Sequence, residues 1–166
     1  GGGEVTGIGA NGRGNLTASA DARDVTVTSG TLTRLGNVTA GNDVRVTSGN
    51  AGLAGSIDIT NANARTGLLQ LTSLNGDIRL GTGNAATTSA LTSNGGGDII
   101  VTTSLISGGD IAVTSGDDTD MLLVRSTGGN VAIVAADGAG AGTVQAAATI
   151  GVDGASNAIG TATAGT

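Results

Sequence analysis

The chain of 166 residues contains no Phe, Tyr, Trp, Pro, Cys or His, and glycine occupies 32 positions. The absence of cysteine excludes a disulfide framework and cysteine-bound zinc or iron, and the net charge of −6 argues against nucleic acid and anionic membrane surfaces as partners. The longest apolar run, 131–136, is far too short to span a bilayer, so we expect no membrane insertion.

Residues 1–14 are rich in glycine and carry only weak apolar marks, so we interpret them as a weak first coil. From residue 15 onward, Gly, Asn or Asp is repeatedly followed by two apolar residues with one other residue between them. Residues two apart in a strand point to the same face, so each copy predicts a short strand with one apolar face. The clearest copies, 24–30, 43–49 and 110–116, end in Ser-Gly, which is typical of a turn.

The apolar pairs recur in two interleaved series with steps of about 20 residues. One series contains Val38, Ile57, Ile78, Ile99, Leu123 and Val144, and the other contains Leu69, Leu91, Ile111 and Val131. This spacing predicts an all-β fold, a parallel β-helix or β-solenoid with coils of about 20 residues and at least two strands per coil. The coils should occupy 15–146, and the Ala/Gly-rich segment 147–166 should form weak coils or an irregular end.

The same alternation predicts which side chains fill the core, which must be narrow because the chain has no aromatic residue. The expected inward residues are Val44, Val46, Ile57, Ile59, Ile78, Leu80, Ile99, Val101, Ile111, Val113, Val131 and Ile133.

Few residues are suited to catalysis, because the chain lacks His, Lys, Tyr and Cys. Asp58 with Asp77, or Asp77 with Asp98, could stack on successive coils as a carboxylate pair, but we interpret these residues as turn formers at the start of strands. We expect no enzymatic activity and no cofactor.

Two further motifs suggest binding functions. Asp117, Asp118 and Asp120 offer hard oxygen ligands of the kind calcium prefers, but we interpret them as a solvated acidic loop and expect no metal site. Threonines recur at Thr26, Thr28, Thr31, Thr33, Thr47, Thr60, Thr72, Thr102 and Thr114. An ice-binding face would need a threonine at one position in every coil, whereas ordinary β-propensity also explains these residues.

The repeat resembles that of filamentous haemagglutinin-type exoproteins, the large adhesins of two-partner secretion systems. The resemblance covers about 14–146 and is carried by Gly-Asp/Asn-apolar-x-apolar copies at 76–80, 97–101 and 129–133. It implies a right-handed parallel β-helix on the bacterial cell surface or outside the cell. The family's secretion domain carries Asn-Pro motifs, and a chain without proline cannot contain them.

We therefore expect a structural, non-catalytic shaft segment of a large bacterial adhesin, with an unidentified receptor. Its partners would be adjacent coils of a longer parent chain, or other copies joined end to end. A standalone ice- or surface-binding solenoid and a self-assembling extracellular filament or matrix protein are the alternatives.

Overall fold

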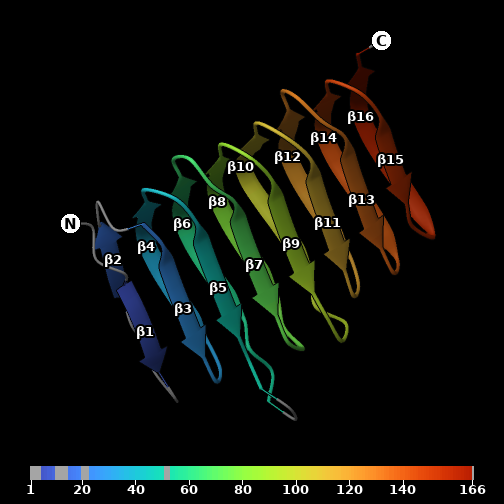
Figure 1. Ribbon diagram of the computed structural model, residues 1–166. Coiled ribbons are helices and arrows are strands. Elements are labelled where there is room, and N and C mark those ends of the chain that lie inside the picture. The colour runs from blue at the N-terminus through green and yellow to red at the C-terminus, as the bar shows by residue number, and fades with distance from the viewer. Residues whose placement is uncertain (1–4, 10–14, 20–22, 51–52, 166) are drawn as a thin grey trace.

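The computed structural model describes residues 5–9, 15–19, 23–50 and 53–165, and the regular elements within these ranges are all β-strands. The strands alternate along the chain between two parallel sheets that run alongside each other for the length of a single rod (Figure 1). Among the described residues, we find no helix with the length and hydrophobicity needed to cross a bilayer.

Each sheet has its strands in sequence order, because every coil adds one strand to each sheet. The first sheet contains β1 (Val5–Gly9), β3 (Val25–Ser29), β5 (Val44–Ser48), β7 (Leu69–Ser73), β9 (Ser89–Ser93), β11 (Ile111–Ser115), β13 (Val131–Ala135) and β15 (Ile150–Asp153). The second sheet contains β2 (Asn15–Ser19), β4 (Thr33–Ala40), β6 (Ile57–Ala64), β8 (Ile78–Ala85), β10 (Ile99–Ser107), β12 (Thr119–Ser126), β14 (Gly138–Ala146) and β16 (Ser156–Ala164). The predicted β-solenoid with coils of about 20 residues is therefore confirmed.

The core is a continuous file of aliphatic side chains between the two sheets. All twelve residues expected to face inward are buried there, each at most 1% exposed. Ile78 illustrates the packing, because it lies between Ile57 and Ile99 in the same register of neighbouring strands. Each inward side chain thus contacts its equivalents one coil before and one coil after.

Strands of the second sheet bend in the middle. In β6, Ile57 and Ile59 face inward, Thr60 and Asn61 both face outward, and Ala62 begins the next inward pair. Two consecutive outward residues break the strict alternation of a straight strand. Each coil therefore turns a corner within this sheet, in addition to the corners between sheets.

Neither of the two series expected from spacing follows a single file of the structure. Leu69 aligns with Ser89, not with Leu91, which occupies the neighbouring inward position and pairs with Leu71. The Ser89 hydroxyl is buried and has no hydrogen-bond partner. Leu123 also departs from its series, because it is outward-facing and Val124 is the inward residue. Spacing alone could not separate positions two residues apart within one strand.

The repeat continues through the C-terminal part of the described chain. β15 and β16 form a further coil on β13 and β14, and Ile150, Val152 and Ile159 pack against the core while remaining partly exposed. Within 1–14, β1 pairs with β3, whereas 1–4 and 10–14 lie outside the described residues.

Three of the described corners contain a residue with a positive φ. These residues are Gly49 at 97°, Asn75 at 62°, and Gly95 and Gly96 at 69° and 84°. A side chain at Gly95 would also place its Cβ atom against the amide group of Asn75 in the preceding coil.

We expect Ile78→Asp to lower the free energy of unfolding by roughly 3 kcal/mol or more, because it would bury an unpaired carboxylate between two isoleucines. Chemical denaturation followed by circular dichroism measures this change. The matched control is Thr102→Asp, which places the same charge at an exposed position of neighbouring strand β10. Equal stability of the two variants would contradict the inward assignment of Ile78.

Candidate functional site

The acidic residues of this chain are organised by a ladder of side chains at the positions just before strands. In each case, a side-chain Oδ1 atom accepts a hydrogen bond from the backbone N–H at the equivalent position one coil later. The ladder residues are Asp24, Asp43, Asp110 and Asn130 before strands of the first sheet, and Asp77, Asp98 and Asp118 before strands of the second.

The ladder explains why aspartate recurs where the chain enters a strand. At this position the chain passes from a corner into a strand. The backbone carbonyl of the residue accepts a hydrogen bond from the N–H of the first strand residue in the preceding coil, as the Asp98 carbonyl does from the Ile78 N–H. Its N–H group is bound by the carboxylate of the preceding coil. A short acceptor such as aspartate reaches this group without bending the strand. The recurring aspartates are therefore structural connections between coils.

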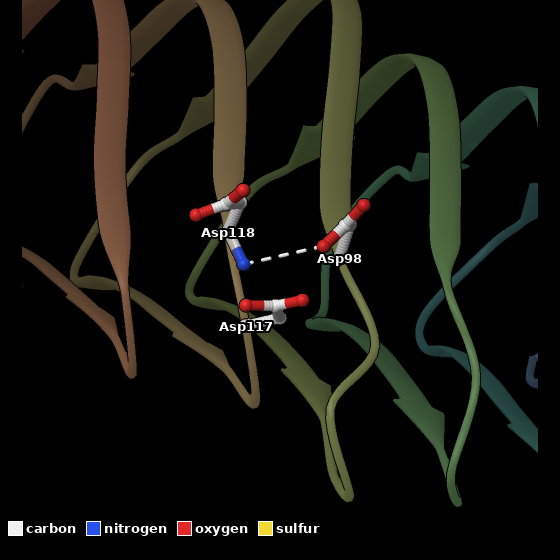
Figure 2. Close-up of side chains that lie close together, drawn as sticks. All are labelled: Asp98, Asp117 and Asp118. Atoms are coloured by element: carbon white, nitrogen blue, oxygen red, sulfur yellow. Dashed lines mark hydrogen bonds between the residues drawn. The ribbon is translucent and has the colours of Figure 1, made fainter.

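Three carboxylates gather at one point of this ladder, as Figure 2 shows. Asp98 precedes β10, and Asp117 and Asp118 lie in the turn between β11 and β12. One oxygen from each of the three lies within 4.8 Å of the other two, and we call these residues the acidic group. The Asp118 N–H donates to Asp98 Oδ1 at 3.2 Å, and Gly138 N–H donates to Asp118 Oδ1 at 2.7 Å.

Asp117 is the member of the acidic group that makes no ladder connection. The carboxylate of Asp118 raises the pKa of Asp117, and partial desolvation, Asp98 and Asp137 act in the same direction. Its backbone N–H contacts Ser115 Oγ at 3.4 Å, which holds the turn in place. The three carboxylates are therefore close together because the turn that holds Asp117 lies next to the ladder residues Asp98 and Asp118.

Hard cations such as calcium are bound by carboxylate oxygens, but calcium takes six to eight oxygen ligands. The acidic group offers three carboxylates, and two of their oxygens already accept backbone hydrogen bonds. Asp120, the third acidic residue singled out from the sequence, is not part of the acidic group and lies on the outer face of β12. It borders one hollow of about 230 Å³ together with Asp118, and another of about 360 Å³ together with Ile100 and Leu122. The group thus has a structural explanation that requires no ion.

The carboxylate pairs considered for catalysis are arranged differently from each other. Asp58 is aligned with Arg79 and forms an ion pair with Arg34, with 3.1 Å between Oδ2 and Nε. Asp77 and Asp98 do occupy equivalent positions in successive coils, and Asp77 Oδ1 accepts the N–H of Asp98 at 3.2 Å. Asp58 and Asp77 are therefore not brought together as a pair.

The threonines singled out from the sequence separate into different surfaces. Thr28, Thr47, Thr72 and Thr114 share one outward position of the first sheet, together with Thr92. Thr60 and Thr102 are exposed on the second sheet, whereas Thr33 is buried. Thr92 was missed in the sequence analysis because the apolar pair before it is weak. The sequence does contain a signal for it, because Thr92 is followed by serine, as are Thr28, Thr47, Thr72 and Thr114.

Comparison with protein-family models, with curated proteins and with solved structures found no match to this chain. A functional proposal therefore depends on the repeat motif, the fold and the surfaces described above. The β-solenoid of stacked coils is consistent with a repeat region.

We expect Asp98→Ala to lower the free energy of unfolding by about 0.5–1.5 kcal/mol, because the N–H of Asp118 loses its acceptor. Asp98→Asn should be close to the parent protein, since the amide oxygen can accept the same hydrogen bond. Urea denaturation of the three proteins measures the difference. If the alanine and asparagine variants lost stability equally, the ladder would not be the role of this carboxylate.

We also expect Asp117→Asn to raise the melting temperature near pH 7, because it removes the repulsion that raises the pKa of Asp117. This repulsion destabilises the fold only when Asp117 is ionised, so the unfavourable term disappears as pH falls through the raised pKa towards the ordinary value of 3.8. The difference in melting temperature should therefore shrink on acidification.

A pH series of thermal melts measures this effect, and Asp153→Asn is the control for net charge. Asp153 is exposed on β15, outside the acidic group. A gain in melting temperature that is equally large at acidic pH, or equally large in the control variant, would contradict the prediction.

Proposed function

We propose that this chain is a non-catalytic structural shaft segment of a large bacterial surface or secreted adhesin. The observation that carries the proposal is the repetition of one coil-to-coil interface along the rod. Each coil continues both parallel sheets, the aliphatic core and the strand-start ladder of the coil before it. A structure of this kind grows in length without growing in width, which suits it to spacing a binding region from a cell.

The chemistry of the side chains supports a mechanical role. The described acidic residues are largely used in ladder connections or ion pairs, as Asp98 and Asp58 illustrate. Buried serines at the corners act in the same way: Ser93 Oγ donates to the carbonyl of Gly76 at 2.7 Å, and Ser115 Oγ donates to that of Gly97 at 2.8 Å. Polar groups in the rod thus connect coils, and the sequence supplies no His, Lys or Cys for nucleophilic or acid–base catalysis.

The repeat motif supports the filamentous haemagglutinin type of exoprotein. The copies at 76–80, 97–101 and 129–133 begin strands β8, β10 and β13 of the rod. In each copy the polar residue precedes the strand and the two apolar residues face inward. Under this proposal the neighbours along the shaft are further coils of the parent chain, and the receptor contact lies elsewhere in that protein.

The test is the size and location of the native protein in its source cells. We expect an immunoblot to show a band far above 15.6 kDa that disappears when protease is added outside intact cells. Lysed cells treated with protease and an intracellular marker protein provide the controls. A band near 15.6 kDa that external protease leaves intact would overturn the shaft proposal.

A further inference from the structure

The outer face of the first sheet contains an uninterrupted file of threonines on five adjacent strands. The register pairs Thr28 with Thr47, Thr47 with Thr72, Thr72 with Thr92, and Thr92 with Thr114. We call these five residues the threonine ladder. All five are at least partly exposed, and their spacing is the inter-strand distance of about 4.8 Å. The ladder thus places a threonine at one position in five successive coils, from β3 to β11, and Val134 occupies this position on β13.

The hydroxyl groups of the threonine ladder make no hydrogen bond to the described part of the protein. Threonines at the corners behave differently: the Thr66 hydroxyl donates to the Gly41 carbonyl at 2.7 Å, and the Thr149 hydroxyl contacts Asn130 Oδ1 at 2.6 Å. Corner threonines therefore connect coils, whereas ladder threonines present their hydroxyl and methyl groups to the surroundings. The connections between coils do not explain the ladder.

The outward file beside the ladder carries no charged residue in its C-terminal half. The other outward file of the first sheet has Ala90, Ala112 and Ala132 on strands β9, β11 and β13. Earlier in this file, Arg45 is held in an ion pair with Asp43, at 2.7 Å between Nη2 and Oδ2. The two outward files contain no carboxylate between β3 and β13. Alanines beside threonine methyl groups leave the hydroxyls as the only polar groups over this half of the face.

The size and chemistry of the face exclude most kinds of partner. Five strands of five residues cover roughly 400 Å², about half of the 800 Å² per partner that a stable protein interface needs. A face without carboxylates has no ligands for a cation, and a single arginine gives little attraction for a polyanion. Carbohydrate surfaces are usually bound by aromatic side chains, and this chain has none. What remains is a periodic file of hydroxyl groups, beside which the one arginine is paired with Asp43.

We propose that the threonine ladder binds the surface of ice. Each hydroxyl can donate and accept one hydrogen bond with water, and the fixed strand spacing repeats this contact at a constant interval. Waters held by the ladder would therefore be ordered along the rod with the period of the sheet. Ala90 and Ala112 lie beside Thr92 and Thr114 without competing for hydrogen bonds, whereas the polar residues Thr26, Arg45 and Gln70 lie beside the first three threonines of the ladder. The proposal depends on the fold alone and is independent of the shaft function.

The test is incorporation of the 166-residue protein into slowly growing polycrystalline ice, together with thermal hysteresis. We expect the parent protein to be concentrated in the ice fraction relative to an unrelated protein of similar size. The double variant Thr72→Lys/Thr92→Lys should lose this enrichment, because two long cations would stand in the middle of the ladder. Circular dichroism and melting temperature establish that the variant is folded.

The matched control is Thr60→Lys/Thr102→Lys, which adds the same charges at exposed positions on the outer face of the second sheet. This control should retain enrichment in ice. The proposal is overturned if the parent protein is not enriched, or if the two double variants behave alike. It is also overturned if sedimentation shows a dimer that only the ladder variant loses, because the occupant of the face would then be a second copy of the chain.

Discussion

The stacking of each inward side chain on its equivalent in the next coil is the constraint on which this structure depends. A core without aromatic residues is thin, so most coils present an aliphatic residue at each inward position, and the exceptions, such as Ser89 and Thr33, are small. This requirement fixes the register of both sheets, since a shift by one residue would turn the inward file outward. The ladder of carboxylates, the buried corner serines and the file of threonines all follow from that register, because each occupies one position that the core repeats.

The architecture could be predicted from the sequence because alternation is a local property. Pairs such as Ile99 and Val101 show which face of a strand is apolar without any knowledge of its neighbours. The register describes how the strands of two neighbouring coils align, so it could be predicted only in part from the sequence. Spacing placed Leu91 in one series with Leu69, but Ser89 aligns with Leu69, and Leu91 is the next inward residue, two positions later. Without the alignment of neighbouring strands, such a substitution within a file cannot be distinguished from a shift of the file itself.

For the candidate site too, features within one stretch of sequence could be predicted, whereas features that depend on the alignment of neighbouring coils could not. The recurrence of aspartate before strands was visible in the sequence, and its interpretation as a structural residue agrees with the hydrogen bonds of Asp77 and Asp98. The acidic group was not visible, because Asp98 is distant in sequence from Asp117 and Asp118 and joins them only through stacking of the coils. Asp120, which is close to them in sequence, lies on the outer face of β12 and is not a member of the acidic group.

The corner between β5 and β6 shows where such a rod can change without losing its order. Equivalent positions before first-sheet strands are 19 residues apart between Asp24 and Asp43, but 25 apart between Asp43 and Leu68. The additional residues lie between the two strands, and β5 and β7 remain paired in full register. Insertions at a corner are thus separated energetically from the stacked core. A lineage of such proteins can diversify its corners while its strands stay the same, and a foreign peptide placed at this corner would be carried on the side of an intact rod.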